Sequence, residues 1–349
     1  MTGPDSSAIL ICVQVRSIVS WSAAVGLVLL GSSLGGQSPA GAGKAKAATK
    51  AKAKGLPVAR TPWGSPDLQG VWFVMADVPL ERSAVNAGKE FLTDAEIAAS
   101  DIRKGLNPGR NARASGAEDV TGAYNAVFNS ILKTGRRTSM IIDPKDGKIP
   151  PSVTPAAQGR GGAGRGAVSQ ANDNPENIAQ SPRCLGVPMP FLPLNTAFAQ
   201  GTVMQLTQSK TSVSIYMEDD HAGGGNRVIY LDGRPHLPAN VKTYLGDSRG
   251  HWEGNTLVVE TTNFSQAFRG SNPDTYKMIE RFTRVDANNL KREITFEDPK
   301  TWTQPWTVLV EMGKTDDKRQ MIFDSACHEG NYGMTGILVG ARRAEQAAK

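Results

Sequence analysis

The sequence predicts a mainly β protein, in which an antiparallel meander closes into a barrel or stacks as a sandwich, with a few helices at its periphery. Three observations over residues 201–326 lead to this fold class. Short apolar runs are separated by turn residues, several runs alternate strictly between apolar and polar residues, and the links carry hairpin-forming residues. Such strands must close or stack, because a flat open sheet would expose its edges.

Residues 1–40 are predicted to be a secretory signal peptide. A polar stretch with one cation, Arg16, precedes an apolar run over 17–30, and small residues follow. The apolar run is shorter than the roughly 20 residues that span a bilayer. We therefore expect cleavage near residues 36–42 and a mature chain without a membrane span, located in the periplasm or outside the cell. The alternative is an uncleaved anchor.

Residues 41–60 are predicted to be a solvated linker rich in lysine and alanine, because they show no apolar periodicity. The linker carries five lysines, and subtracting them from the net charge of +6 leaves +1 for the rest of the chain. A nearly neutral body is a poor match for nucleic acid, whose binding needs many cations on one face. Nucleic acid is therefore excluded as a partner.

Residues 61–200 are predicted to form an irregular N-terminal half with one helix and few strands. Thr93 and Glu96 fit a capping box, which predicts a helix over 94–104. The other expected features are a first strand within 61–75, a strand over 138–143, and a long irregular stretch over 144–200 with a glycine-arginine insert at 159–166.

The core over residues 201–326 is predicted to hold nine strands. Alternation places Trp306, Val308 and Val310 on one face, for example. The strands are expected near residues 202–208, 211–218, 226–231, 249–252, 256–262, 276–285, 290–298, 305–313 and 319–326. Residues 327–349 should form a loop and an amphipathic helix over 334–349 that packs on the outside.

Only two cysteines, Cys184 and Cys327, lie beyond the signal peptide. In an oxidising compartment, two cysteines suggest one disulfide. The alternative is a pair of buried thiols.

Three blocks of the sequence resemble a family of uncharacterised exported proteins of soil bacteria. They are TPWGSPDLQGVW at 61–72, LDGRPHLPANVKTYLGDSRGHWEGNTLVVETTNF at 231–264 and ACHEGNYGMTGILVGARRAEQ at 326–346. This resemblance implies no particular activity. Gly70 and Trp72 are also similar to the Gly-x-Trp motif in the first strand of the lipocalin and calycin barrels. That resemblance implies a barrel whose cup holds a small apolar molecule.

All four histidines (His221, His236, His251 and His328) lie in the barrel region of the sequence or directly after it. The leading hypothesis is general acid-base catalysis at a barrel mouth by an exported lyase, isomerase or hydrolase, acting on a small, partly apolar molecule. His236 or His221 would move a proton. Asp232 would orient the imidazole, and Arg234 would hold an anionic or carbonyl oxygen.

His328 and Glu329, just before the final helix, are second candidates for catalysis. A divalent metal held by two or three histidines with Glu329 or Asp220 is an alternative, although no HExxH, paired-cysteine or calcium-loop spacing is present. A third interpretation is structural, with Asp232 paired to Arg234 and the histidines bonded to loop carbonyls.

Ligand-binding candidates are Trp252, Trp306, Glu260 and Tyr332, although tryptophan more often packs in a core. No nucleophile elbow or phosphate-binding loop occurs, so no organic cofactor is expected. A small molecule is the expected partner, and the sequence leaves the oligomeric state open. Two functions from other classes remain: a periplasmic carrier without turnover, and an interaction protein of the cell envelope.

Overall fold

The computed structural model describes residues 58–106, 132–153, 174–178, 181–185, 189–194, 203–217, 225–266, 268–315, 322 and 326–347. Contacts divide the chain into two units, residues 1–52 and residues 53–349, and every described residue belongs to the second. The predicted signal peptide, the glycine-arginine insert and His221 lie outside the described residues. No helix within the described ranges is long and apolar enough to cross a membrane.

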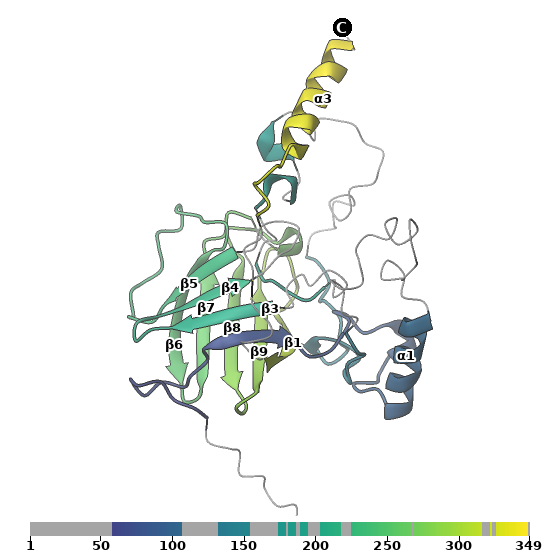
Figure 1. Cartoon of the computed structure of the whole chain (residues 1–349), viewed down its shortest axis with the longest axis vertical. Coiled ribbons are helices and arrows are strands. Elements are labelled where there is room, and N and C mark those ends of the chain that lie inside the picture. The colour runs from purple at the N-terminus through teal and green to yellow at the C-terminus, as the bar shows by residue number, and fades with distance from the viewer. Residues whose placement is uncertain are drawn as a thin grey trace, which may run out of the picture. The chain divides into compact units, whose positions relative to one another are not determined.

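Nine strands of a ten-stranded sheet form a closed barrel, which confirms the predicted fold class (Figure 1). The strands are β1 (Gly70–Val74), β2 (Ile141–Asp143), β3 (Val203–Gln208), β4 (Ser212–Met217), β5 (Gly225–Tyr230), β6 (Asp247–Glu253), β7 (Thr256–Thr262), β8 (Lys277–Arg284), β9 (Asn289–Glu297) and β10 (Trp306–Lys314). The barrel runs from β1 through β3 to β10 in chain order, and β10 closes it by pairing with β1. β2 is the tenth strand and pairs with the first part of β10.

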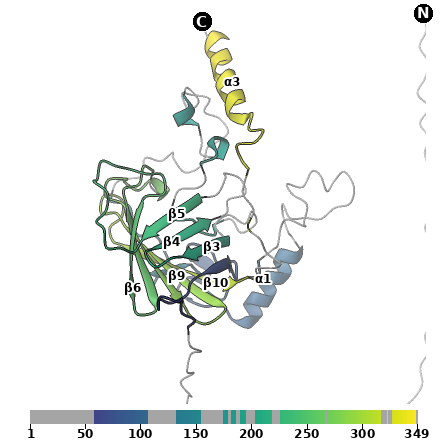
Figure 2. The same cartoon turned by 60° about the vertical axis from the view of Figure 1, so that its left-hand side comes forward.

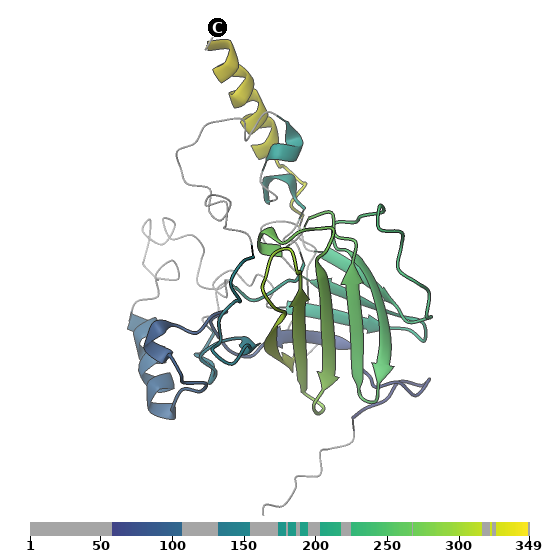
Figure 3. The same ribbon diagram turned by 180° about the vertical axis from the view of Figure 1, so that it is seen from behind.

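Two views show how the barrel is built. In Figure 2 the labelled strands β3, β4 and β5 follow one another along one wall, and Figure 3 shows the longer strands of the opposite wall from behind. Strands β3 to β10 coincide with eight of the nine predicted core strands. Most of the ninth prediction, 319–326, lies outside the described residues.

The meander is interrupted once, which corrects the expectation of an entirely antiparallel sheet. β5 and β6 pair in parallel, with Ile229 opposite Ser248. A parallel pair cannot be joined by a tight hairpin. Residues 231–246, which we call the crossing segment, therefore carry the chain back to the start of β6. This segment contains Asp232, Arg234 and His236, and Figure 1 shows the long connection that it makes.

Two α-helices occur in the described part of the chain, α1 (Asp94–Leu106) and α3 (Gly333–Ala347). The predicted capping box is confirmed at the start of α1: the Glu96 amide donates to Thr93 Oγ1 at 3.3 Å, and the Thr93 amide donates to Glu96 Oε2 at 2.8 Å. The predicted C-terminal helix forms as α3. None of its side chains is buried, so the expected packing of this helix on the barrel is not observed.

Alternation along the strands fills the inside of the barrel. On β8, for example, Met278, Glu280 and Phe282 are buried, while the residues between them face outward. Aromatic rings pack beside β9 and β10, where Phe296 stacks on Trp306 with ring centroids 4.0 Å apart. Trp306 therefore belongs to the core and does not line an open site. Trp252 is partly buried against the same core.

Cys184 and Cys327 form the predicted disulfide, with their Cα atoms 5.6 Å apart. The bond closes a loop of 143 residues, which in the chain-entropy model stabilises the fold by roughly 5 kcal/mol before any native strain is subtracted. Asn331 supports the junction, because its side-chain amide donates to the carbonyl of Pro182 at 2.8 Å. The disulfide thus ties the start of α3 to residues 181–185.

Candidate functional site

His236 lies on the outer face of the barrel, between the beginning of β6 and the end of β7. Its Nδ1 is 2.7 Å from Asp247 Oδ2, and its Nε2 is 3.3 Å from Glu260 Oε1. Thr262 Oγ1 lies 3.3 Å from the same Nδ1. The contacts arise from register, because Asp247 lies opposite Thr262 across the β6–β7 pair, and both side chains point outward. Both ring nitrogens of His236 therefore face carboxylates.

Asp247 holds the ring of His236 in one orientation. Its side chain is only 7% exposed, and its other oxygen, Oδ1, is 2.7 Å from Arg249 Nη1. The backbone amide of Leu237 donates to Oδ2 at 3.0 Å. A carboxylate that accepts these bonds is an acceptor only, so Nδ1 of His236 donates its proton to Asp247. In the neutral ring with its proton on Nδ1, Nε2 carries the lone pair, and once protonated it can donate to Glu260, which is likewise only an acceptor.

Asp232 was expected either to orient His236 or to pair with Arg234, and the structure shows the pairing with Arg234. Asp232 accepts from Arg234 Nε at 2.9 and 2.8 Å. Arg234 also stacks on the ring of Tyr230, 4.2 Å from its centroid. The Arg234 guanidinium lowers the pKa of Asp232, and Asp232 raises the pKa of Arg234. These two residues pair with each other at the start of the crossing segment. In the described structure neither forms a hydrogen bond or an ion pair with His236.

A row of charges continues from His236 across the outer face of the barrel. Glu260 Oε2 on β7 lies 3.7 Å from Lys277 Nζ on β8, and Lys277 Nζ lies 2.8 Å from Glu297 Oε2 on β9. The bond to Glu297 raises the pKa of Lys277, against a smaller opposing effect of burial. We call Asp247, His236, Glu260, Lys277 and Glu297 the His236 network.

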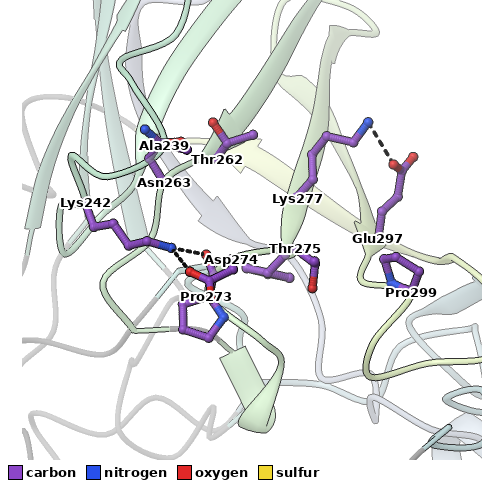
Figure 4. Close-up of a pocket in the computed structure, with 11 residues that line it drawn as sticks. Ala239, Lys242, Thr262, Asn263, Pro273, Asp274, Thr275, Lys277, Glu297 and Pro299 are labelled. Carbon is purple, nitrogen blue, oxygen red and sulfur yellow. Dashed lines mark hydrogen bonds and ion pairs between the residues drawn. The ribbon is translucent and has the colours of Figure 1, made fainter.

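A cleft of about 450 Å³ adjoins this network (Figure 4). It is lined by Ala239, Lys242, Thr262, Asn263, Pro273, Asp274, Thr275, Tyr276, Lys277, Glu297 and Pro299. Lys242 points toward Asp274, with 2.5 Å between the charged atoms, and Lys277 points toward Glu297. Lys277 and Glu297 belong to both the cleft and the network, and Thr262 of the cleft contacts His236. The lining of the cleft therefore combines apolar surface with charges of both signs.

Asn263 fixes the crossing segment over the cleft. Its side-chain amide donates to three backbone carbonyls, those of Leu237, Pro238 and Val241, at 2.9–3.0 Å. Its φ of 57° is in the left-handed region, which asparagine tolerates better than most residues. This clamp positions His236 and Lys242 relative to β7.

The remaining candidates lie apart from the His236 network. His251 is exposed on β6 and lies 3.2 Å from Glu253. His328, Glu329 and Tyr332 are exposed near the Cys184–Cys327 disulfide, and Tyr332 is 83% exposed. His221 lies outside the described residues. The structure thus joins His236 and Glu260 among the predicted site residues, and adds Asp247, Thr262 and Lys277, which the sequence reasoning did not single out.

A second polar cluster, also missed by the sequence reasoning, lies inside the barrel. Glu280 on β8 is fully buried between Arg227 on β5 and Arg292 on β9. Arg292 donates to Glu280 Oε1 from Nε at 2.9 Å and from Nη2 at 2.7 Å, while Arg227 Nη1 lies 2.5 Å from Oε2. Burial raises the pKa of Glu280, but Arg227 and Arg292 together outweigh it, so the pKa lies below its usual value. We call these three residues the inner cluster.

Comparisons with known proteins supply no further guide to this chain. No family model, curated protein or solved structure matches it. Over the described residues, no group of three or more His, Cys, Asp or Glu side chains is arranged to hold a metal ion.

Proposed function

We propose that the protein is an exported enzyme that transfers a proton on a small polar molecule bound in the outer cleft, with His236 as the general base. The observation that carries this proposal is the 2.7 Å contact between His236 Nδ1 and Asp247 Oδ2. An imidazole held at Nδ1 by a buried carboxylate presents Nε2 for proton transfer, and histidine is the side chain most often used for this purpose.

The charges around the cleft suit this chemistry. When a substrate C–H or O–H proton moves to Nε2, the electron pair stays on the substrate as a developing anion. Lys277 and Lys242, which line the cleft, can stabilise that anion. Glu260 can swing away from Nε2 to admit the substrate, because 44% of its side chain is exposed. This cleft replaces the interior of the barrel as the proposed place of reaction.

The test compares wild type with His236→Gln and with His251→Gln as a matched control, all as full-length chains. The assays are hydrolysis of p-nitrophenyl esters and exchange of the α-proton of small 2-oxo acids for deuterium. We expect His236→Gln to lose about 10²- to 10⁴-fold in rate. His251→Gln should match wild type in both assays.

Equal rates for wild type and a folded His236→Gln variant would contradict the proposal. Wild-type rates no higher than the buffer background in both assays would also contradict it. Those results would instead favour a carrier that binds its ligand without turnover.

A further inference from the structure

Arg227 has a buried guanidinium edge that no described residue satisfies. Its Nη1 faces Glu280, Ser248 and Thr261, at 2.5, 3.5 and 3.3 Å respectively. Its Nε and Nη2 are shielded from solvent and have no hydrogen-bond partner among the described residues. Buried polar groups almost always have a partner, and leaving a charged donor unpaired is costly. We therefore expect the edge formed by Nε and Nη2 to donate to a hydrogen-bond acceptor that is not among the described residues.

The same edge holds a carboxylate on two other arginines of this chain. Arg292 uses Nε and Nη2 to bond Glu280, and Arg234 uses Nε and Nη2 to bond Asp232. The two N–H groups on this edge are parallel and can bond both oxygens of a carboxylate, as in Arg234, or one oxygen, as in Arg292. Arg227 bonds Glu280 through Nη1, but its Nε–Nη2 edge, unlike that of Arg292 and Arg234, has no carboxylate from the described residues.

Charge balance points to the same kind of ligand. The inner cluster contains two guanidinium groups and one carboxylate, so it carries one excess positive charge in a buried position. Burial and the neighbouring Arg227 lower the pKa of Arg292, while Glu280 opposes them. One monoanion would neutralise the cluster, whereas a dianion such as phosphate would leave it negative.

Besides Glu280, Ser248 and Thr261, which face its Nη1, Arg227 has apolar neighbours on the inner side of the barrel wall. Ile215 lies opposite Arg227 across the β4–β5 pair, Ile229 is the next inward residue along β5, and both are completely buried. A ligand here would have a small apolar body behind its charged group. We infer that the barrel interior binds the carboxylate of a small, apolar organic acid on the Nε–Nη2 edge of Arg227. This site is distinct from the outer cleft, because Arg227 points inward and the His236 network lies on the outer face.

The experiment measures binding of sodium acetate and sodium benzoate to the full-length chain by calorimetry and thermal melting at constant ionic strength. Acetamide and benzamide serve as controls with nearly the same shape and no charge. We expect at least one carboxylate to bind and to raise the melting temperature, because a ligand that binds only the folded state stabilises it. Its neutral amide should leave the melting temperature unchanged.

A conservative variant locates the site. Arg227→Lys keeps the positive charge but loses the two-pronged edge, so we expect at least a tenfold loss of carboxylate affinity. Arg281→Lys is the matched control, since Arg281 lies on the outward face of β8 and pairs with Glu253; its affinity should equal that of wild type. If Arg227→Lys does not fold, a crystal structure of wild type with the bound carboxylate makes the same distinction.

Three results would overturn the inference: no binding of either carboxylate, equal effects of a carboxylate and its amide, or electron density for water alone on the edge of Arg227. None of these results bears on catalysis at His236, so the two proposals can fail separately.

Discussion

Asp247, the first residue of β6, and His236 in the crossing segment are joined at 2.7 Å, although they are 11 residues apart in the sequence. The same carboxylate bonds the backbone amide of Leu237 and the guanidinium of Arg249. One buried side chain therefore anchors the crossing segment to the barrel and orients the imidazole. A change at Asp247 therefore alters both the position of the crossing segment and the orientation of His236.

Replacing Asp247 by Asn should impair both roles of this side chain, the anchoring of the crossing segment and the orientation of the imidazole. The amide keeps the size of the side chain but removes the charge that pairs with Arg249, so we expect a loss of about 2–3 kcal/mol in the free energy of unfolding. Urea denaturation measures this value, and ¹⁵N chemical shifts of the imidazole report the tautomer of His236. We expect the proton to leave Nδ1 in a larger fraction of molecules.

Asp232→Asn is the matched control for this experiment. Asp232 bonds Arg234 in the same segment but is exposed, so its replacement should leave both the unfolding free energy and the tautomer of His236 unchanged. If the two variants behave alike, Asp247 does not anchor His236.

Glu280→Gln should be among the most damaging single substitutions in the barrel. It removes the carboxylate shared by Arg227 and Arg292 and leaves two buried cations together. Breaking a buried ion pair on one side typically destabilises a protein by about 3–5 kcal/mol. Glu311→Gln, at an exposed position on β10, is the control and should unfold at the wild-type urea concentration. A loss below about 1 kcal/mol for Glu280→Gln would show that the inner cluster is not held by this carboxylate.

The strand pattern of this chain was predictable, because alternation along β8, β9 and β10 reflects a local property of each strand. Burial of every second side chain requires only that one face meets a core. The capping box at Thr93 was equally predictable, since its two hydrogen bonds span three residues. Local chemistry thus accounts for most of the elements.

The sites depend on register between distant strands, which the sequence does not display. Arg227, Glu280 and Arg292 meet because β5, β8 and β9 present them at one level inside the barrel, and an arginine in an alternating strand is ordinarily assigned to the wet face. Asp247 and Glu260 both lie in the block over residues 231–264. Their separation in the sequence does not show that both contact His236, because that contact depends on how β6 and β7 pair. Of the two roles expected for Asp232, the pairing with Arg234 forms, because the two residues are only two positions apart in one turn.

The capping box should make the start of α1 sensitive to acid. Lys89 and Thr93 hold the Glu96 carboxylate in its ionised form, the Lys89 bond contributing most, and they lower its pKa from 4.5 to about 2. A pKa that is lower in the folded state contributes stability above the unfolded value near 4.5, and this contribution is lost as the pH falls toward 2. NMR titration of the Glu96 carboxyl carbon should show a midpoint near 2. Thr93→Ala should move that midpoint upward and destabilise the helix by about 1 kcal/mol.

Asp101→Asn provides the comparison for Thr93→Ala. Asp101 also lies in α1 and has a lowered pKa, but the cause is the Thr134 backbone amide and not the helix start. This variant should leave the Glu96 midpoint in place. A Glu96 midpoint near 4.5 in wild type would contradict the role assigned to the capping box.

Two glycines of the crossing segment allow its backbone to be tested without touching a charge. Gly233 has a φ of 75° and Gly246 a φ of 74°, so alanine at either position adopts the same unfavourable left-handed conformation. That conformation costs about 1–2 kcal/mol for a residue with a Cβ atom. Around Gly233 nothing lies within 4 Å of the new Cβ, whereas at Gly246 it would lie 2.6 Å from Thr261 and 2.8 Å from the carbonyl of Thr262.

The difference between the two alanine variants therefore measures how tightly the crossing segment is pressed against the end of β7. We expect Gly233→Ala to lose about 1 kcal/mol and Gly246→Ala about 3 kcal/mol or more in urea denaturation, since overpacking adds to the backbone term. Because Gly246 directly precedes Asp247, relief of the clash must also displace the carboxylate that holds His236. Gly246→Ala should consequently change the imidazole ¹⁵N shifts, and Gly233→Ala should not. Equal losses for the two variants would mean that the segment can move away from β7 freely, and His236 would then lack the fixed position that proton transfer requires.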